Sequence, residues 1–169
     1  MKHFKTLLFA AVLFIGATGL SVAQTKVAHI NTTELVKAMP EMKSAQAEIE
    51  KLSKTYDTEI KNMTTELQNK MKQYQSEAET KTDEENANRV KELQEFEQSI
   101  MQYRSQAQQD LAQKEAKLVQ PILEKAKNAI EKVAKAQGFQ YVLDSTQGSG
   151  VLVADGKDLL NDVKKELGI

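Results

Sequence analysis

Side chains that could carry out chemistry are few in this chain, and their spacing does not assemble a familiar catalytic or metal site. The chain has no cysteine and two histidines, of which His29 lies in a predicted strand. A zinc site needs several histidine or cysteine ligands, and a Ser/His or Cys/His pair needs a base beside its nucleophile. We therefore interpret His29 as a packed or surface residue, and we expect no metal ion and no cofactor.

Carboxylates offer the other chemistry, that of a general acid or base. Asp144 and Ser145 follow a predicted strand, but aspartate and serine favour turns for conformational reasons alone. Elsewhere the carboxylates alternate with lysine and glutamine, as on a solvated helical face, whereas acid–base catalysis needs burial that shifts their pKa. No glycine occurs between Gly19 and Gly138, which excludes a nucleotide-binding glycine loop there. We predict that the protein is not an enzyme.

The longest feature is the segment from Glu41 to Gln137, which contains no glycine and a single proline, Pro121. Apolar residues recur there every eleven positions, as Ile49, Ile60 and Met71 do in the first half and Ile100, Leu111, Ile122 and Val133 in the second. This period is about 3.67 residues per turn, close to an unstrained helix. Because the run is too long for one globular helix, it predicts a helical hairpin.

The turn of the hairpin is predicted from Thr82–Glu85, which has the form of a capping box at the start of a second helix. The arm then comprises residues 41–121, with its tip near residues 80–83. In this register five apolar pairs come level: Leu52 with Leu111, Tyr56 with Ala107, Ile60 with Tyr103, Met63 with Ile100, and Leu67 with Phe96. Pro121 lies level with Met42, and we expect it to kink the second helix at the arm root.

Short β-like segments flank the arm and predict a small body, formed by residues 24–40 and 122–169. The predicted strands are Lys26–Ile30, Phe139–Leu143 and Val151–Ala154, and the predicted short helices are Thr32–Ala38 and a C-terminal helix from Asp158 to Gly168. The fold class is therefore α+β and mostly helical, with a small β-containing body that carries a long antiparallel helical hairpin.

Such a small body is only marginally stable alone, and its strands have apolar residues on both faces, so we expect it to self-associate. The residues expected at this interface are Val27, Ile30, Phe139, Tyr141, Leu143, Val151 and Val153. Other apolar residues lie off the hairpin seam or at its root, where flexible methionines suit contact with varied partners. These partner-contact candidates are Met42, Met101, Val119 and Leu123.

Residues 1–23 have the pattern of a cleaved signal peptide, with Lys2 and Lys5 before an apolar stretch and a small-x-small site that ends at Ala23. An uncleaved membrane anchor is the alternative, but the apolar stretch is shorter than the ~20 residues that span a bilayer. Removing Lys2 and Lys5 from a chain of 23 basic and 24 acidic residues leaves a net charge of −3. This balance argues against nucleic acid as a partner.

The order of these parts resembles the Skp/OmpH family of periplasmic chaperones. The resemblance rests on the signal peptide, the Lys-Val-Ala-x-Ile-Asn strand at 26–31, the charged hairpin, the Tyr-Val-Leu-Asp segment at 141–144 and the short C-terminal helix. It implies a homotrimer with a central β-barrel-like body and three helical arms around a cavity. It also implies an ATP-independent holdase that binds unfolded outer-membrane proteins in the periplasm and prevents their aggregation.

The arm tip departs from the family pattern, since better-known members are strongly basic with positive tips. Residues 75–90 carry five carboxylates against Lys81 and Arg89. We therefore do not expect lipopolysaccharide or membrane binding, and we expect client capture to depend little on salt. The alternative function is a structural coiled-coil spacer or adaptor of the cell envelope, whose arm binds one fixed partner.

Overall fold

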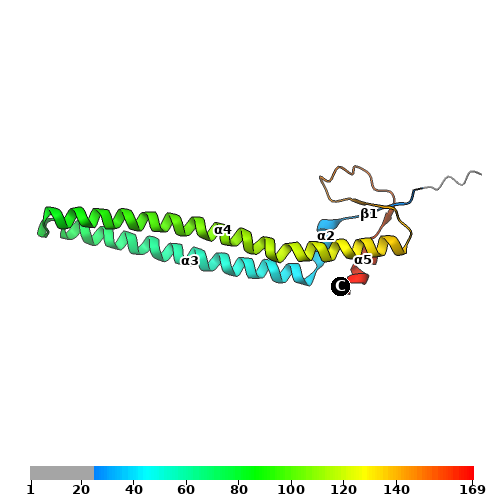
Figure 1. The fold of residues 1–169 in the computed structure, drawn as a ribbon, viewed down its shortest axis with the longest axis horizontal. Coiled ribbons are helices and arrows are strands. Elements are labelled where there is room, and N and C mark those ends of the chain that lie inside the picture. The colour runs from blue at the N-terminus through cyan, green and yellow to red at the C-terminus, as the bar shows by residue number, and fades with distance from the viewer. Residues whose placement is uncertain (1–24) are drawn as a thin grey trace, which may run out of the picture.

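The computed structural model describes residues 25–169, so the predicted signal peptide and its cleavage site lie outside the described residues. A small body sits at one end of a long helical hairpin (Figure 1). The elements, in order, are β1 (Val27–Ile30), α2 (Thr32–Ala38), α3 (Pro40–Glu77), η1 (Ala78–Thr80), α4 (Asp83–Ala136), β2 (Tyr141–Asp144), β3 (Lys157–Asp158) and α5 (Leu160–Leu167). This arrangement confirms the predicted fold class.

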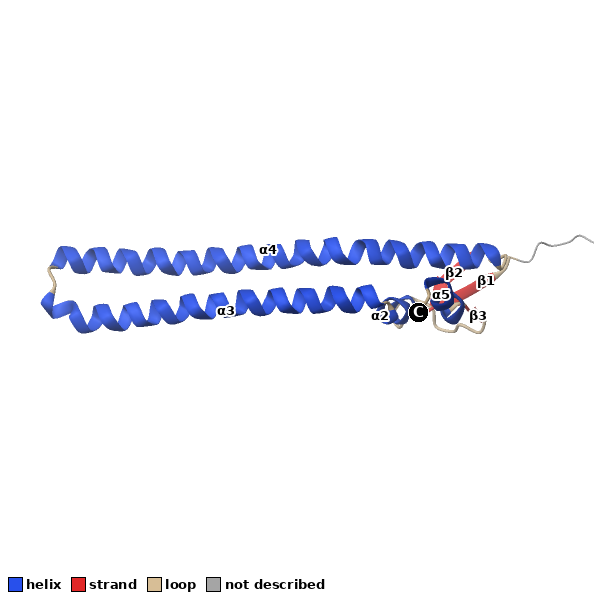
Figure 2. Ribbon diagram, turned by 90° about the horizontal axis from the view of Figure 1, so that it is seen from below, coloured by secondary structure: helices blue, strands red, loops and turns tan. Residues whose placement is uncertain are grey.

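The arm is formed by α3 and α4, which run antiparallel and side by side (Figure 2). At 1.5 Å per residue, the 38 residues of α3 extend about 57 Å. The capping box predicted at the tip is confirmed: the Thr82 hydroxyl accepts a hydrogen bond from the Glu85 amide at 3.2 Å, and the Glu85 carboxylate accepts one from the Thr82 amide at 3.0 Å. Two helix-terminal donors are thereby satisfied.

Cross-helix contacts fix the register of the hairpin. Lys114 pairs with Glu48 at 2.7 Å, and Lys70 pairs with Glu92 at 2.5 Å. Each pair lies within one residue of the level expected from a tip at residues 80–83. Leu67, Ile100 and Ala107 are buried along the seam between the helices, as the eleven-residue pattern predicts for an apolar stripe.

Pro40 and Pro121 stand close together at the arm root and line one hollow between the two helices. Pro40 occupies the first turn of α3, where its missing N–H costs nothing. Pro121 lies inside α4, which runs unbroken from Asp83 to Ala136. The missing hydrogen bond at Pro121 therefore does not end the helix, whose next fifteen residues pack in the body.

The sheet of the body has the order β2-β1-β3, and all its pairings are parallel. Ala28 and Ile30 of β1 are buried on one face, against the helices of the body. The core also contains Met39, which lies between α2 and α3. The helices α2, α3, α4 and α5 contribute Leu35, Met42, Ala45, Ile122, Ala126, Ala129, Val133, Ala134, Leu160 and Val163. The root of the arm and the body therefore share one core.

The predicted third strand at residues 151–154 is wrong. These residues lie in an irregular loop, and the third strand is Lys157–Asp158 instead. The apolar run Val151–Ala154 predicted extended structure, but β1 already pairs with β2 and β3 on its two sides. Gly148 and Gly150 have φ values of 90° and 92°, a left-handed backbone that glycine adopts readily. They lead the loop away from the sheet (Figure 1).

Within residues 25–169, no helix is long and apolar enough to span a membrane.

Candidate functional site

One face of the sheet is left uncovered by the helices. The parallel register places Val27 level with Tyr141 and His29 level with Leu143, so these four side chains share a face. Tyr141 is 61% exposed, and Val27 and Leu143 are also exposed. An apolar face rimmed by edge strands is typical of an interaction surface. We call Val27, Tyr141 and Leu143 the open sheet face.

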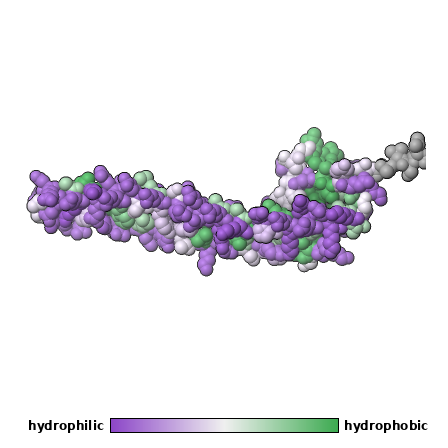
Figure 3. Space-filling model, in the orientation of Figure 1, coloured by the Kyte–Doolittle hydropathy of each residue, from purple (hydrophilic) through white to green (hydrophobic). Residues whose placement is uncertain are grey.

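The loop of residues 145–156 adds further apolar surface beside this sheet. Leu152 is 97% exposed and Val153 is 82% exposed. Figure 3 shows apolar surface gathered on the body, where the loop projects, while most of the arm is hydrophilic. The two segments together make the body, not the arm, the place where exposed apolar groups concentrate.

His29 holds the two ends of this loop together. Its Nε2 lies 3.2 Å from the Gly156 carbonyl oxygen, and its Nδ1 lies 3.3 Å from the Ser145 hydroxyl. Because a carbonyl oxygen can only accept, Nε2 donates, and in the neutral ring Nδ1 accepts from Ser145. Both ring nitrogens are therefore engaged in loop contacts, which agrees with the interpretation of His29 as a packed residue.

Asp144 has a comparable structural task at the end of β2. Its carboxylate accepts hydrogen bonds from the Thr32 hydroxyl at 2.6 Å and the Thr146 amide at 2.9 Å. Partial burial would raise the pKa of Asp144, but the hydrogen bonds from Thr32 and Thr146 outweigh it and lower the pKa to about 2. A carboxylate held ionised in this way suits a cap for the start of α2 and not a proton donor.

The predicted self-association residues divide into exposed and buried sets. Val27, Tyr141, Leu143 and Val153 are exposed. Val151 is half-buried, and Phe139 packs partly buried against the core. Ile30 is buried inside the single chain, and we withdraw it as an interface residue. Alternation alone could not reveal this, because it does not tell which face of β1 the helices cover.

The partner-contact candidates on the arm divide in the same way. Met101 is 62% exposed and Leu123 is exposed, while Val119 packs partly buried against the core. Met42 is only 8% exposed, because α4 covers it at the arm root, and we withdraw it as a surface contact. Val90 is an exposed apolar residue that the sequence pattern did not single out, although its place off the eleven-residue stripe was a usable signal.

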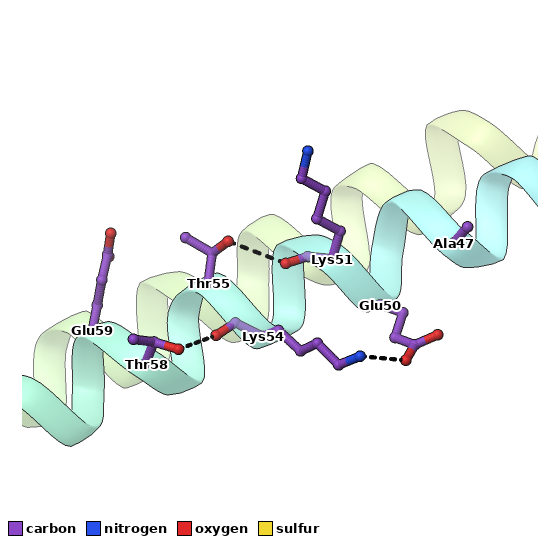
Figure 4. A pocket seen from close by; sticks show the side chains of 7 residues that line it. All are labelled: Ala47, Glu50, Lys51, Lys54, Thr55, Thr58 and Glu59. Carbon is purple, nitrogen blue, oxygen red and sulfur yellow. Dashed lines mark hydrogen bonds and ion pairs between the residues drawn. The ribbon is translucent and has the colours of Figure 1, made fainter.

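Hollows along the arm differ in their chemistry. The one in Figure 4 lies on the polar outer face of α3, around Ala47. Its Thr55 and Thr58 hydroxyls donate to backbone carbonyls four residues earlier, at 3.1 and 2.7 Å. These polar groups are already satisfied within the helix. A second hollow, between the helices at the arm root, has an apolar floor that includes Ile49 and Val119.

Among residues 25–169, no three His, Cys, Asp or Glu side chains are grouped closely enough to hold a metal ion. The geometry instead provides an open sheet face on a small body and scattered apolar groups on a long arm. Such surfaces can bind other polypeptides through burial of apolar area.

Comparisons with known proteins identify similar sequences and folds. A model of the outer membrane protein (OmpH-like) family matches residues 26–167. The fold is similar to the crystal structure of a protein described as a candidate outer membrane chaperone (OmpH-like) from Caulobacter crescentus CB15. That protein is 18% identical, with a TM-score of 0.75 over 85% of each chain. No curated protein matches the chain in sequence.

Proposed function

Because the family model matches nearly all of the described residues, the chain belongs to the OmpH-like outer membrane protein family, and we propose that it is a holdase chaperone of the periplasm. It binds unfolded outer-membrane proteins between its helical arms, without ATP, and keeps them from aggregating. The family match is the observation that carries this proposal. The signal-peptide pattern of residues 1–23 supports the periplasmic location.

The form of the arm supports holding by many weak contacts. Exposed apolar residues such as Val90, Met101 and Leu123 are spread along an otherwise polar hairpin. Each contact is worth little by itself, but several arms that act on one flexible client raise the effective concentration of every contact. Release then needs no nucleotide, because individual contacts break readily.

Several arms require several copies, and we propose that the body forms a homotrimer. The open sheet face and the exposed Val153 are the surfaces that support self-association. The strands β2 and β3 are the edges of the sheet, and an extended segment can add to such an edge through backbone hydrogen bonds. The loop of residues 145–156 supplies four consecutive apolar residues, Val151–Ala154, which suit pairing with another copy.

An aggregation assay tests the proposed function. An outer-membrane β-barrel protein is diluted from urea into buffer with or without residues 24–169, and light scattering is followed over time. The proposal predicts that near-stoichiometric protein suppresses scattering of several unrelated β-barrel clients without ATP. Aggregation that proceeds unchanged, together with recovery of one fixed envelope partner, would instead favour the spacer or adaptor.

A further inference from the structure

The second hollow described above has a volume of about 520 Å³ and lies between α3 and α4 at the arm root. Its floor is apolar and is formed by Met42, Ala45, Ile49 and Val119. A hollow of this size is in the range that holds a bound side chain or small ligand. Met42 and Ala45 belong to the shared core, so the floor is held in place by the body.

The rim of this hollow is acidic. It carries Glu50, Asp57 and Glu115 against one lysine, Lys54. Lys54 pairs with Glu50 at 2.8 Å (Figure 4). The other two rim carboxylates, Asp57 and Glu115, are not paired with this lysine. Asp57 and Glu115 have no ion-pair partner among residues 25–169.

The neighbouring hollow at the same height shows the contrast. Its rim carboxylates, Glu41 and Glu48, pair with Lys125 and Lys114 from the facing helix. The rim carboxylates of the neighbouring hollow are therefore neutralised by lysines. Asp57 and Glu115, around the floor of Ile49 and Val119, are not. An apolar floor with an uncompensated negative rim is complementary to an apolar group that carries a positive neighbour.

We propose that this hollow binds an apolar side chain that stands next to lysine or arginine in an unfolded polypeptide. The inference rests on the proposed holdase function, since it names the kind of client segment that the arm root selects. The apolar side chain is buried against Ile49 and Val119, and the cationic neighbour lies beside Asp57 and Glu115. Segments that carry aspartate or glutamate in place of the cation are repelled by the same rim.

The test compares three labelled peptides of equal length, which alternate leucine with lysine, leucine with glutamate, and serine with lysine. Fluorescence anisotropy measures their affinity for residues 24–169. We expect the leucine–lysine peptide to bind most tightly. The double variant Asp57→Asn/Glu115→Gln should weaken it by about two- to fivefold for each carboxylate removed, as for exposed ion pairs. The double variant should also reduce the difference in affinity between the leucine–lysine and the leucine–glutamate peptides.

A matched control removes two exposed carboxylates outside the hollow, one from each helix, as Glu66→Gln/Glu97→Gln. It should leave the peptide preference unchanged, and circular dichroism should show the same helix content for all variants. Val119→Ser should weaken both leucine peptides. Equal binding of the leucine–lysine and leucine–glutamate peptides, or an equal loss in the control, would overturn the inference.

Two further outcomes distinguish a hollow that binds clients from one that faces another copy of the chain. If Val119→Ser lowers the mass of the assembly but leaves peptide affinity unchanged, the hollow faces another copy and the inference fails. If the wild-type protein suppresses client aggregation while no peptide preference is found, only the inference fails. A wild-type protein that does not suppress aggregation contradicts the holdase proposal, whatever the peptides do.

Discussion

Asp144 accepts hydrogen bonds from both the backbone amide and the hydroxyl of Thr32, at 3.3 and 2.6 Å. The two residues are 112 positions apart, and the entire arm lies between them. Their contact closes the body, because it joins the end of β2 to the first residue of α2. Asn31 caps the same helix through the Glu34 amide at 2.9 Å, so the start of α2 is held by two side chains.

The first prediction concerns acid stability. The pKa of Asp144 is lowered from 3.8 to about 2 in the folded protein. A lowered folded pKa gives stability that is present above about pH 4 and is lost as the pH falls toward 2. We expect Asp144→Asn to cost roughly 1–2 kcal/mol of unfolding free energy at pH 7 and little at pH 2, as measured by urea denaturation. Asp155→Asn, in the exposed loop, should cost little at either pH.

The second prediction concerns the loop of residues 145–156. His29→Ala removes the contacts to Ser145 and Gly156 that hold its two ends. Amide hydrogen exchange and limited proteolysis within the loop should therefore become faster. The free energy of global unfolding should fall by only about 1 kcal/mol, the net contribution of a typical hydrogen bond. Lys26→Ala, an exposed residue beside β1, is the control. An unchanged exchange rate would show that the His29 side chain does not hold the ends of the loop in place.

The third prediction concerns the arm tip. The Arg89 guanidinium lies 4.6 Å from the ring centroid of Tyr74 and pairs with Glu77 at 2.5 Å. Lysine cannot reproduce both the stacking and the fork geometry of arginine. Arg89→Lys should therefore speed amide exchange of residues 74–92 by about two- to fivefold, the effect of weakening one cation–π contact. The control Lys91→Arg, on the exposed side of α4, should leave amide exchange of these residues unchanged. Equal effects of the two substitutions would contradict this role for Arg89.

The fourth prediction concerns self-association. Tyr141→Glu places a charge on the open sheet face, where an apolar partner surface is expected. Because burial of one large apolar side chain contributes about 1.5–3 kcal/mol, we expect the assembly to weaken by at least about tenfold, measured as mass against concentration. Val90→Glu, on the arm, should leave the mass unchanged. Dissociation by Val90→Glu alone would move the interface to the arm.

The fifth prediction concerns salt. Client capture through apolar groups on an arm with an acidic tip should change little between about 10 and 200 mM salt, although screening lengths shorten severalfold over this range. The peptide preference at the arm root should weaken modestly over the same range. A steep loss of client affinity would indicate that charge, and not apolar burial, carries the binding.

The hairpin was predictable because its signals are local. The capping box at Thr82–Glu85 spans four residues, and the eleven-residue period needs only the geometry of one helix. The helix Thr32–Ala38 has the predicted bounds, since Asn31 and Pro40 mark its limits in the sequence. Signals of this kind, such as helix caps and apolar periods, can be read from the sequence because here the local preference and the tertiary structure agree.

The errors arose where the answer depends on distant neighbours. Residues 151–154 have a strand pattern but join no sheet in their own chain, and Lys157–Asp158 pairs with the second side of β1 instead. Met42 was predicted to be accessible, but it is buried in the core that the arm root shares with the body. The hydrogen bond between His29 and Ser145 joins residues 116 positions apart. Nothing in the local sequence around His29 indicates this partner.

The central claim is best tested by the mass of residues 24–169, measured by light scattering after chromatography, alone and mixed with an outer-membrane β-barrel protein diluted from urea. We predict a trimer that takes up one soluble client, which otherwise aggregates. A monomer, or an oligomer that elutes unchanged while the client precipitates, would contradict the account.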